Sequence, residues 1–62
     1  MEFDSKYFII ENKIRTLERF LNKLYLLRTF AKIKANDRLV IELDKEIDRI
    51  ESEITLLKKA LE

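Results

Sequence analysis

The amino-acid sequence predicts an all-α protein, an antiparallel two-helix hairpin with coiled-coil-like packing that we expect to dimerise into a four-helix bundle. Three observations predict this fold. The 62 residues include no Gly and no Pro, which the tight turns of β-proteins normally need. Apolar residues recur at alternating steps of three and four in both halves, as in a coiled-coil heptad. A single turn signal, KANDR, separates the two halves.

The first heptad pattern predicts a helix over about residues 5–35. Asp4 is placed to cap its start, and Phe3 and Phe8 are placed as a hydrophobic staple. The seam of this helix consists of the residues at heptad positions a and d: Tyr7, Ile10, Ile14, Leu17, Leu21, Leu24, Arg28 and Ala31.

The turn is predicted at about residues 35–37 and the second helix at about 38–61. Asn36 is a candidate for the left-handed residue that ends the first helix, and Asp37 for the cap of the second. The seam of the second helix is again unbroken: Val40, Leu43, Ile47, Ile50, Ile54, Leu57 and Leu61.

Folding the chain back at this turn brings the two seams into register. The pairing that sets Leu24 against Ile47 and Ile14 against Leu57 places every a residue opposite a d residue, and it puts the turn at Ala35 and Asn36. The structural alternative is one continuous helix over residues 4–61, since neither Asn nor Asp forbids a helix.

The first helix carries more apolar residues than a lone hairpin can cover. Beside the seam, at heptad position g, Phe20 and Leu27 would face acidic residues of the second helix, and further apolar residues lie nearly opposite the seam. A helix that is apolar all round is normally buried all round. The first helix is also the longer one, so the aromatic residues at its start lack a neighbour on the second helix. We therefore predict a partner or oligomer interface formed by Phe3, Tyr7, Phe8, Phe20, Leu26, Leu27, Phe30 and Ile33.

The composition limits how so short a chain can supplement its core. A 62-residue fold has little margin over conformational entropy. With no Cys and no His, disulfides and ordinary zinc sites are excluded, and so are imidazole bases and thiolate nucleophiles. We expect no catalytic residues, no metal and no cofactor, and a homo-oligomer, with a dimer favoured.

Arg28 is the one charged residue at a seam position. We interpret it as a buried polar residue that fixes the register or the oligomeric state, with Asp44 or Glu46 of either chain as its counter-ion.

The stretch LNKLYLLRTFAKIK, residues 21–34, faintly resembles the long helix of the all-helical chorismate mutases, in which Arg28 would be the substrate-binding arginine. The chain departs from that family, because Leu39 stands where the family has a lysine and the chain is too short for three helices. The sequence is not assigned to the family, and we expect no enzyme.

The charge distribution is asymmetric although the net charge is only +1. Residues 11–38 contain eight Lys or Arg and three acids, whereas residues 39–62 contain seven acids and four bases. A basic ridge, defined as Arg15, Arg19 and Lys23, steps along the outer face of the first helix and is a possible nucleic-acid contact.

The function predicted from these features is that of a non-enzymatic oligomeric hairpin that binds an unidentified protein, as a small regulator, inhibitor or assembly factor. A dimeric hairpin that binds RNA or DNA through the basic ridge is the alternative. No apolar run approaches the length of a membrane span, and the start of the chain, with Glu2 and Asp4, lacks the basic region of a secretory signal. We therefore expect a cytoplasmic protein.

Overall fold

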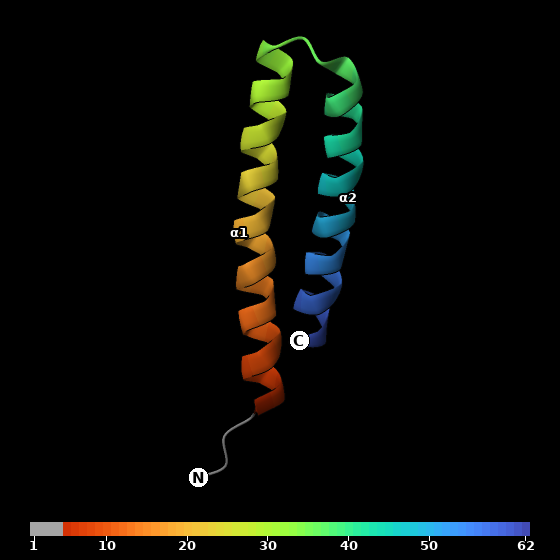
Figure 1. Ribbon diagram of the computed structural model, residues 1–62. Coiled ribbons are helices and arrows are strands. Elements are labelled where there is room, and N and C mark those ends of the chain that lie inside the picture. The colour runs from red at the N-terminus through yellow and green to blue at the C-terminus, as the bar shows by residue number, and fades with distance from the viewer. Residues whose placement is uncertain (1–4) are drawn as a thin grey trace.

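The protein is an antiparallel hairpin of two α-helices. The computed structural model describes residues 5–62, with α1 over Ser5–Ile33 and α2 over Asp37–Ala60. The helices run side by side and are joined by a short turn at one end (Figure 1). The molecule measures 55 × 15 × 11 Å along its principal axes. The chain therefore folds back on itself, and the alternative of one continuous helix is wrong.

The hydrophobic core lies along the predicted seam. Its seven buried residues are Ile14, Leu24, Ala31, Leu43, Ile47, Ile50 and Ile54. Six partly buried residues pack against them: Ile10, Leu17, Leu21, Val40, Leu57 and Leu61. Together these are all of the predicted seam residues except Tyr7 and Arg28, so the heptad assignment is confirmed.

The core is one layer of side chains thick, because two helices cover each other along one stripe only. Ile50, 2% exposed, is the least exposed of the core residues. Leu17 and Leu57 are only partly buried although they belong to the seam. Each helix also keeps most of its outer surface in water, and this is the surface on which any binding function must lie.

The turn ends α1 with a Schellman motif. The Ala35 N–H donates to the Lys32 carbonyl at 3.0 Å, and the Asn36 N–H donates to the Ala31 carbonyl at 2.9 Å. Ala35 carries the positive φ, 54°, that closes the motif. Asn36 then caps α2, since its side chain accepts a hydrogen bond from the Leu39 N–H at 3.2 Å.

The two turn roles are thus each one residue earlier than predicted. Asn36 was expected to be the left-handed residue and Asp37 the cap. The side-chain oxygen of Asn36 is the one that caps α2, and the two Schellman hydrogen bonds compensate for placing an alanine in the left-handed region.

Replacing Ala35 with Gly is expected to stabilise the hairpin by about 1 kcal/mol, because Gly has no Cβ to clash at positive φ. Urea denaturation followed by circular dichroism measures the change. Lys34→Gly is the matched control, because that residue directly precedes Ala35 but is not at positive φ. Equal destabilisation by both substitutions would contradict this account of the turn.

The helix bounds differ slightly from those expected. α1 ends at Ile33 rather than near residue 35, because the Schellman hydrogen bonds from Ala35 and Asn36 end the helix there, and α2 spans Asp37–Ala60 rather than about 38–61. α1 is the longer helix by five residues, and its N-terminal end extends past the end of α2 (Figure 1). The predicted cap Asp4 and the predicted staple residue Phe3 lie outside the described residues.

Candidate functional site

Five of the large apolar side chains that α1 exposes to solvent lie close together in the half of the helix near the turn. We call them the α1 apolar face: Phe20 (43% exposed), Leu26 (58%), Leu27 (51%), Phe30 (52%) and Ile33 (75%). All five belong to the interface predicted from the sequence, and they lie on one side of α1.

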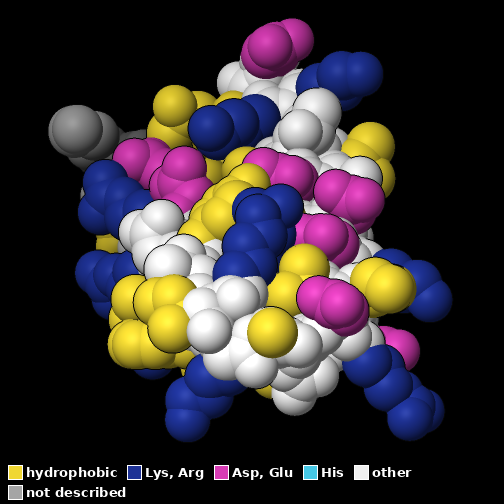
Figure 2. Space-filling model, turned by 90° about the horizontal axis from the view of Figure 1, so that it is seen from above, with side chains coloured by type: hydrophobic (Ala, Val, Ile, Leu, Met, Phe, Trp, Pro, Cys, Tyr) yellow, Lys and Arg dark blue, Asp and Glu magenta, His cyan; other side chains and the backbone are white. Residues whose placement is uncertain are grey.

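These residues form a continuous stripe beside the seam. Phe20 and Leu27 occupy position g, Phe30 position c, and Leu26 and Ile33 position f, which are neighbouring positions around a helix. Figure 2, viewed from the turn end, shows hydrophobic side chains gathered at the lower left, on the side of the molecule where α1 lies, with Lys and Arg beside them. Leu39 of α2, 43% exposed, occupies the g position on the same side of the seam and extends the stripe across the hairpin.

The exposed area of this stripe is large for so small a molecule. At about 150–200 Å² per fully exposed large apolar side chain, the exposed fractions of the six residues correspond to roughly 500–600 Å². The largest apolar patch on a typical monomer is about 300–600 Å² and is often functional. The α1 apolar face with Leu39 therefore stands at the upper end of that range on a molecule with only 5323 Å² of accessible surface.

The aromatic residues at the start of α1 form a separate exposed group. Tyr7 is 49% exposed and Phe8 51%, and Ile9 beside them is 62% exposed. They lie on the part of α1 that extends past α2, far from the α1 apolar face (Figure 1). The structure thus divides the predicted interface in two, and Phe3 lies outside the described residues.

Charged side chains of α2 lie on the same side of the hairpin as the α1 apolar face. Glu46, at the g position opposite Leu27 in the seam register, forms an ion pair with Arg49. The hydrogen bond from Arg49 holds the pKa of Glu46 below its ordinary value of 4.5, and the same contact raises the pKa of Arg49. The pair therefore stabilises the protein at neutral pH and is lost as the pH falls through the lowered pKa of Glu46.

Arg28 is partly exposed rather than buried as its seam position suggested. Its Nε lies 2.6 Å from Asp44 Oδ1, with the two side chains 33% and 47% exposed. Nε is shielded from water but lacks a hydrogen bond, so the contact is an ion pair by distance without hydrogen-bond geometry. The long side chain extends out of the seam towards a carboxylate at its edge, and such partly exposed pairs are worth at most about 1 kcal/mol.

On the other side of the seam, Tyr25 and Glu51 form a link between the helices that the sequence reasoning missed. The Tyr25 hydroxyl donates to Glu51 Oε2 at 2.9 Å. Lys58 Nζ lies 3.7 Å from Glu18 Oε2 on the same side. All four residues are at heptad position e, and the antiparallel register sets the e positions of the two helices opposite each other. The register therefore contains enough information to predict both pairs from the sequence.

The Tyr25–Glu51 hydrogen bond is expected to affect the titration of Tyr25. This hydrogen bond is the main cause that raises the pKa of Tyr25 above its ordinary value of 10.0. The stability that the bond adds is present below that value and is lost as the pH rises through the raised pKa.

Absorbance titration near 295 nm, in a Tyr7→Phe background that leaves one tyrosine, measures this pKa. Glu51→Gln should lower it, whereas Asp48→Asn, which removes a nearby charge without removing the hydrogen bond, should change it less. An equal effect of both substitutions would show that charge alone sets the pKa.

The basic ridge is exposed along α1. Arg15 lies 3.1 Å from Glu11, one turn earlier, which partly neutralises that end of the ridge. Arg19 and Lys23 are exposed, and Lys23 lies between Phe20 and Leu27 at the edge of the α1 apolar face. The ridge and the apolar face therefore share one side of α1.

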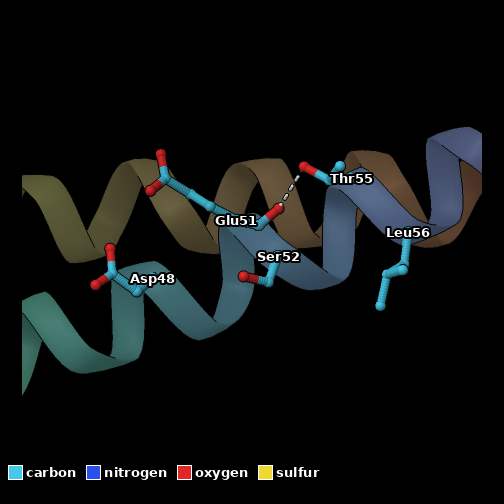
Figure 3. A pocket seen from close by; sticks show the side chains of 5 residues that line it. All are labelled: Asp48, Glu51, Ser52, Thr55 and Leu56. Carbon is cyan, nitrogen blue, oxygen red and sulfur yellow. Dashed lines mark hydrogen bonds between the residues drawn. The ribbon is translucent and has the colours of Figure 1, made fainter.

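The hollow shown in Figure 3 lies on α2 and is lined by Asp48, Glu51, Ser52, Thr55 and Leu56. Because all five residues belong to one helix, the hollow is an open part of the surface. Leu56 points away from the carboxylate of Glu51, which is already bonded to Tyr25, and the Thr55 hydroxyl donates to the Glu51 carbonyl at 3.0 Å (Figure 3). No converging set of reactive groups lines this hollow.

Residues 5–62 contain no group of three or more acidic, His or Cys side chains placed to hold a metal ion. Neither of the two helices, over the same residues, is long and apolar enough to cross a membrane. No protein-family model, curated protein or solved structure matches this chain significantly.

Proposed function

We propose that this protein is a non-enzymatic helical hairpin that acts by binding proteins through the α1 apolar face, as a small regulator, inhibitor or assembly factor. We further propose that it works as a homodimer, in which two hairpins form a four-helix bundle. The observation that carries both proposals is the exposure of five large apolar side chains on one side of a helix.

A second copy of the chain is the partner that the physical chemistry favours first. A single-layer core in a chain of 62 residues leaves little stability, and oligomerisation is the usual supplement where disulfides and metals are absent. On each copy the α1 apolar face and Leu39 together expose roughly 500–600 Å², so two copies bury about 1,000 Å² or more when these surfaces meet, which reaches the lower limit for a specific interface. In a dimer with a two-fold axis, the same surface of both copies forms the interface.

The basic ridge supports a second candidate function, the binding of RNA or DNA. α1 contains seven Lys or Arg and only two acids. In a dimer the ridge would be present twice, and contacts with phosphates gain from each added cation. The Glu11 pair at Arg15 reduces the free charge of the ridge, and for that reason we rank this function second.

Replacing the three ridge residues by Ser tests the ranking. For a protein-binding dimer, the combined variant Arg15→Ser, Arg19→Ser and Lys23→Ser should still dimerise by light scattering after gel filtration. Its dissociation constant should rise by no more than about tenfold, because exposed ion pairs such as those open to Lys23 contribute little. Any affinity for a labelled RNA hairpin or DNA duplex should be weak and unselective.

The opposite result would reverse the ranking. Tight binding to the nucleic acid, falling at least about tenfold between 50 mM and 200 mM salt and lost in the triple variant, would establish the second function in place of the first.

A further inference from the structure

We infer that two copies pack with their turns at the same end of the bundle, so that α1 of each copy lies against α2 of the other. The inference rests on the proposed homodimer and specifies its arrangement. It follows from two independent features of the hairpin: where the α1 apolar face lies along the helix, and how charge is divided between the helices.

The α1 apolar face lies off centre, in the half of the hairpin near the turn. Its members run from Phe20 to Ile33, whereas α1 begins at Ser5. If two hairpins overlapped fully with their turns at opposite ends, Leu27 of one copy would lie level with Lys13 of the other, at the same heptad position. Phe20 would still lie level with Phe20 of the other copy, but Leu27 would face a lysine. With the turns at the same end, Phe20 and Leu27 of both copies lie at matching levels and can form one central core.

The charges of the helices favour the same arrangement. Turns at opposite ends stack α1 on α1, and each α1 has seven Lys or Arg against two acids. Turns at the same end stack α1 on α2 of the other copy, and α2 has seven acids against five bases. Opposite charges in neighbouring helices favour this pairing, and like charges disfavour the other.

Specific residues show how the charges would match. In the seam register Lys23 lies level with the stretch of α2 between Glu46 and Glu53, and both glutamates occupy g positions on the side of the α1 apolar face. A second hairpin in the same-end arrangement brings its own α2 to that level. Lys23 of each copy then lies between two glutamates of the other, beside the central Phe20 and Leu27.

Distances between spin labels on the two copies distinguish the arrangements, and the absence of Cys makes single labels simple to place. Arg38→Cys and Lys59→Cys are a matched pair. Both residues are exposed, both occupy position f of α2, and each loses one positive charge. One lies near the turn and the other at the far end of α2.

The same-end arrangement predicts that both labels give intermolecular distances below about 30 Å, the width of a four-helix bundle with labels. Full overlap with turns at opposite ends predicts about 45 Å for the Arg38→Cys labels and about 30 Å for Lys59→Cys, so the Arg38→Cys distance excludes or supports this arrangement. In a third arrangement the turns are again at opposite ends, but only the halves of the hairpins near the turns overlap. It predicts a shorter distance for the Arg38→Cys labels and about 40 Å for Lys59→Cys. Either long distance would overturn the inference.

The mass of the labelled samples, measured by sedimentation, separates the two ways of failing. A dimer with one long distance contradicts the arrangement but leaves the proposed homodimer standing. A monomeric mass, with no intermolecular distance from either label, contradicts the homodimer itself and the inference with it. Dilution with unlabelled chains should reduce the intermolecular signal if it arises from a dimer.

Discussion

Replacing Phe30 with Glu is expected to raise the dissociation constant of the dimer at least about 100-fold, which corresponds to roughly 3 kcal/mol. Phe30 is 52% exposed on the lone hairpin, so its ring contributes little to the hairpin core. In the dimer each copy would bury a carboxylate against apolar side chains without a partner, and such burial is strongly unfavourable. Two-fold symmetry doubles the effect, because each substitution occurs twice per interface.

Ile41→Glu is the matched control for this prediction. Ile41 is 55% exposed, like Phe30, but it occupies position b of α2, on the other side of the seam from the α1 apolar face. It should change the dissociation constant by no more than about threefold, as expected for a surface substitution away from the interface. Sedimentation over a range of concentrations measures both variants. An equal effect of the two would show that the α1 apolar face has no special role in association.

Replacing Ile50 with Ala is expected to lower the free energy of unfolding by about 2–5 kcal/mol, the range for truncating a buried Ile or Leu. Ile50 is 2% exposed and lies in the middle of a core only one layer thick. A domain of this size has a total stability of only about 3–5 kcal/mol from its own core. The variant should therefore be largely unfolded at low concentration.

Leu56→Ala is the control, because it removes a similar side chain from the surface. Leu56 is 66% exposed on α2, and its truncation should change the free energy of unfolding by no more than about 0.5 kcal/mol. Urea denaturation followed by circular dichroism measures both variants at one protein concentration. A loss as large for Leu56→Ala as for Ile50→Ala would mean that the seam is not the main core.

The core of the fold could be predicted from the sequence because it depends on periodicity alone. Alternating steps of three and four select one stripe of each helix. Antiparallel registers that place a against d recur every seven residues, and only one of them puts the turn within KANDR. Leu24, Ile47 and Ile50 are buried as that register requires. The absence of Gly and Pro left KANDR as the only place for the turn.

The details of the turn could not be predicted, because they depend on a competition between neighbouring residues. Ala35 has no intrinsic preference for positive φ, and Asn36 suits both the left-handed position and the cap. The choice is decided by the hydrogen bonds that the closed Schellman motif makes to Ala31 and Lys32, and these exist only once the chain has folded back.

The candidate site could be predicted in part. Counting apolar residues around α1 was sufficient to find Phe20, Leu27 and Phe30. The exposure of Arg28 could not be read from its heptad position, because a long side chain can leave the seam while its Cα stays in it. Leu39 shares position g with Phe20 but lies on α2, so it joins this surface only once the antiparallel register sets the g positions of the two helices on one side of the seam.

The most direct measurement is the molecular mass of the protein in solution, by sedimentation equilibrium at tens of micromolar. One chain has a mass of 7.5 kDa. If a second hairpin covers the α1 apolar face, the measured mass is twice that of one chain and falls towards that of one chain on dilution. A mass that stays at 7.5 kDa across this range would contradict the account, because the exposed apolar residues of α1 would then remain in water.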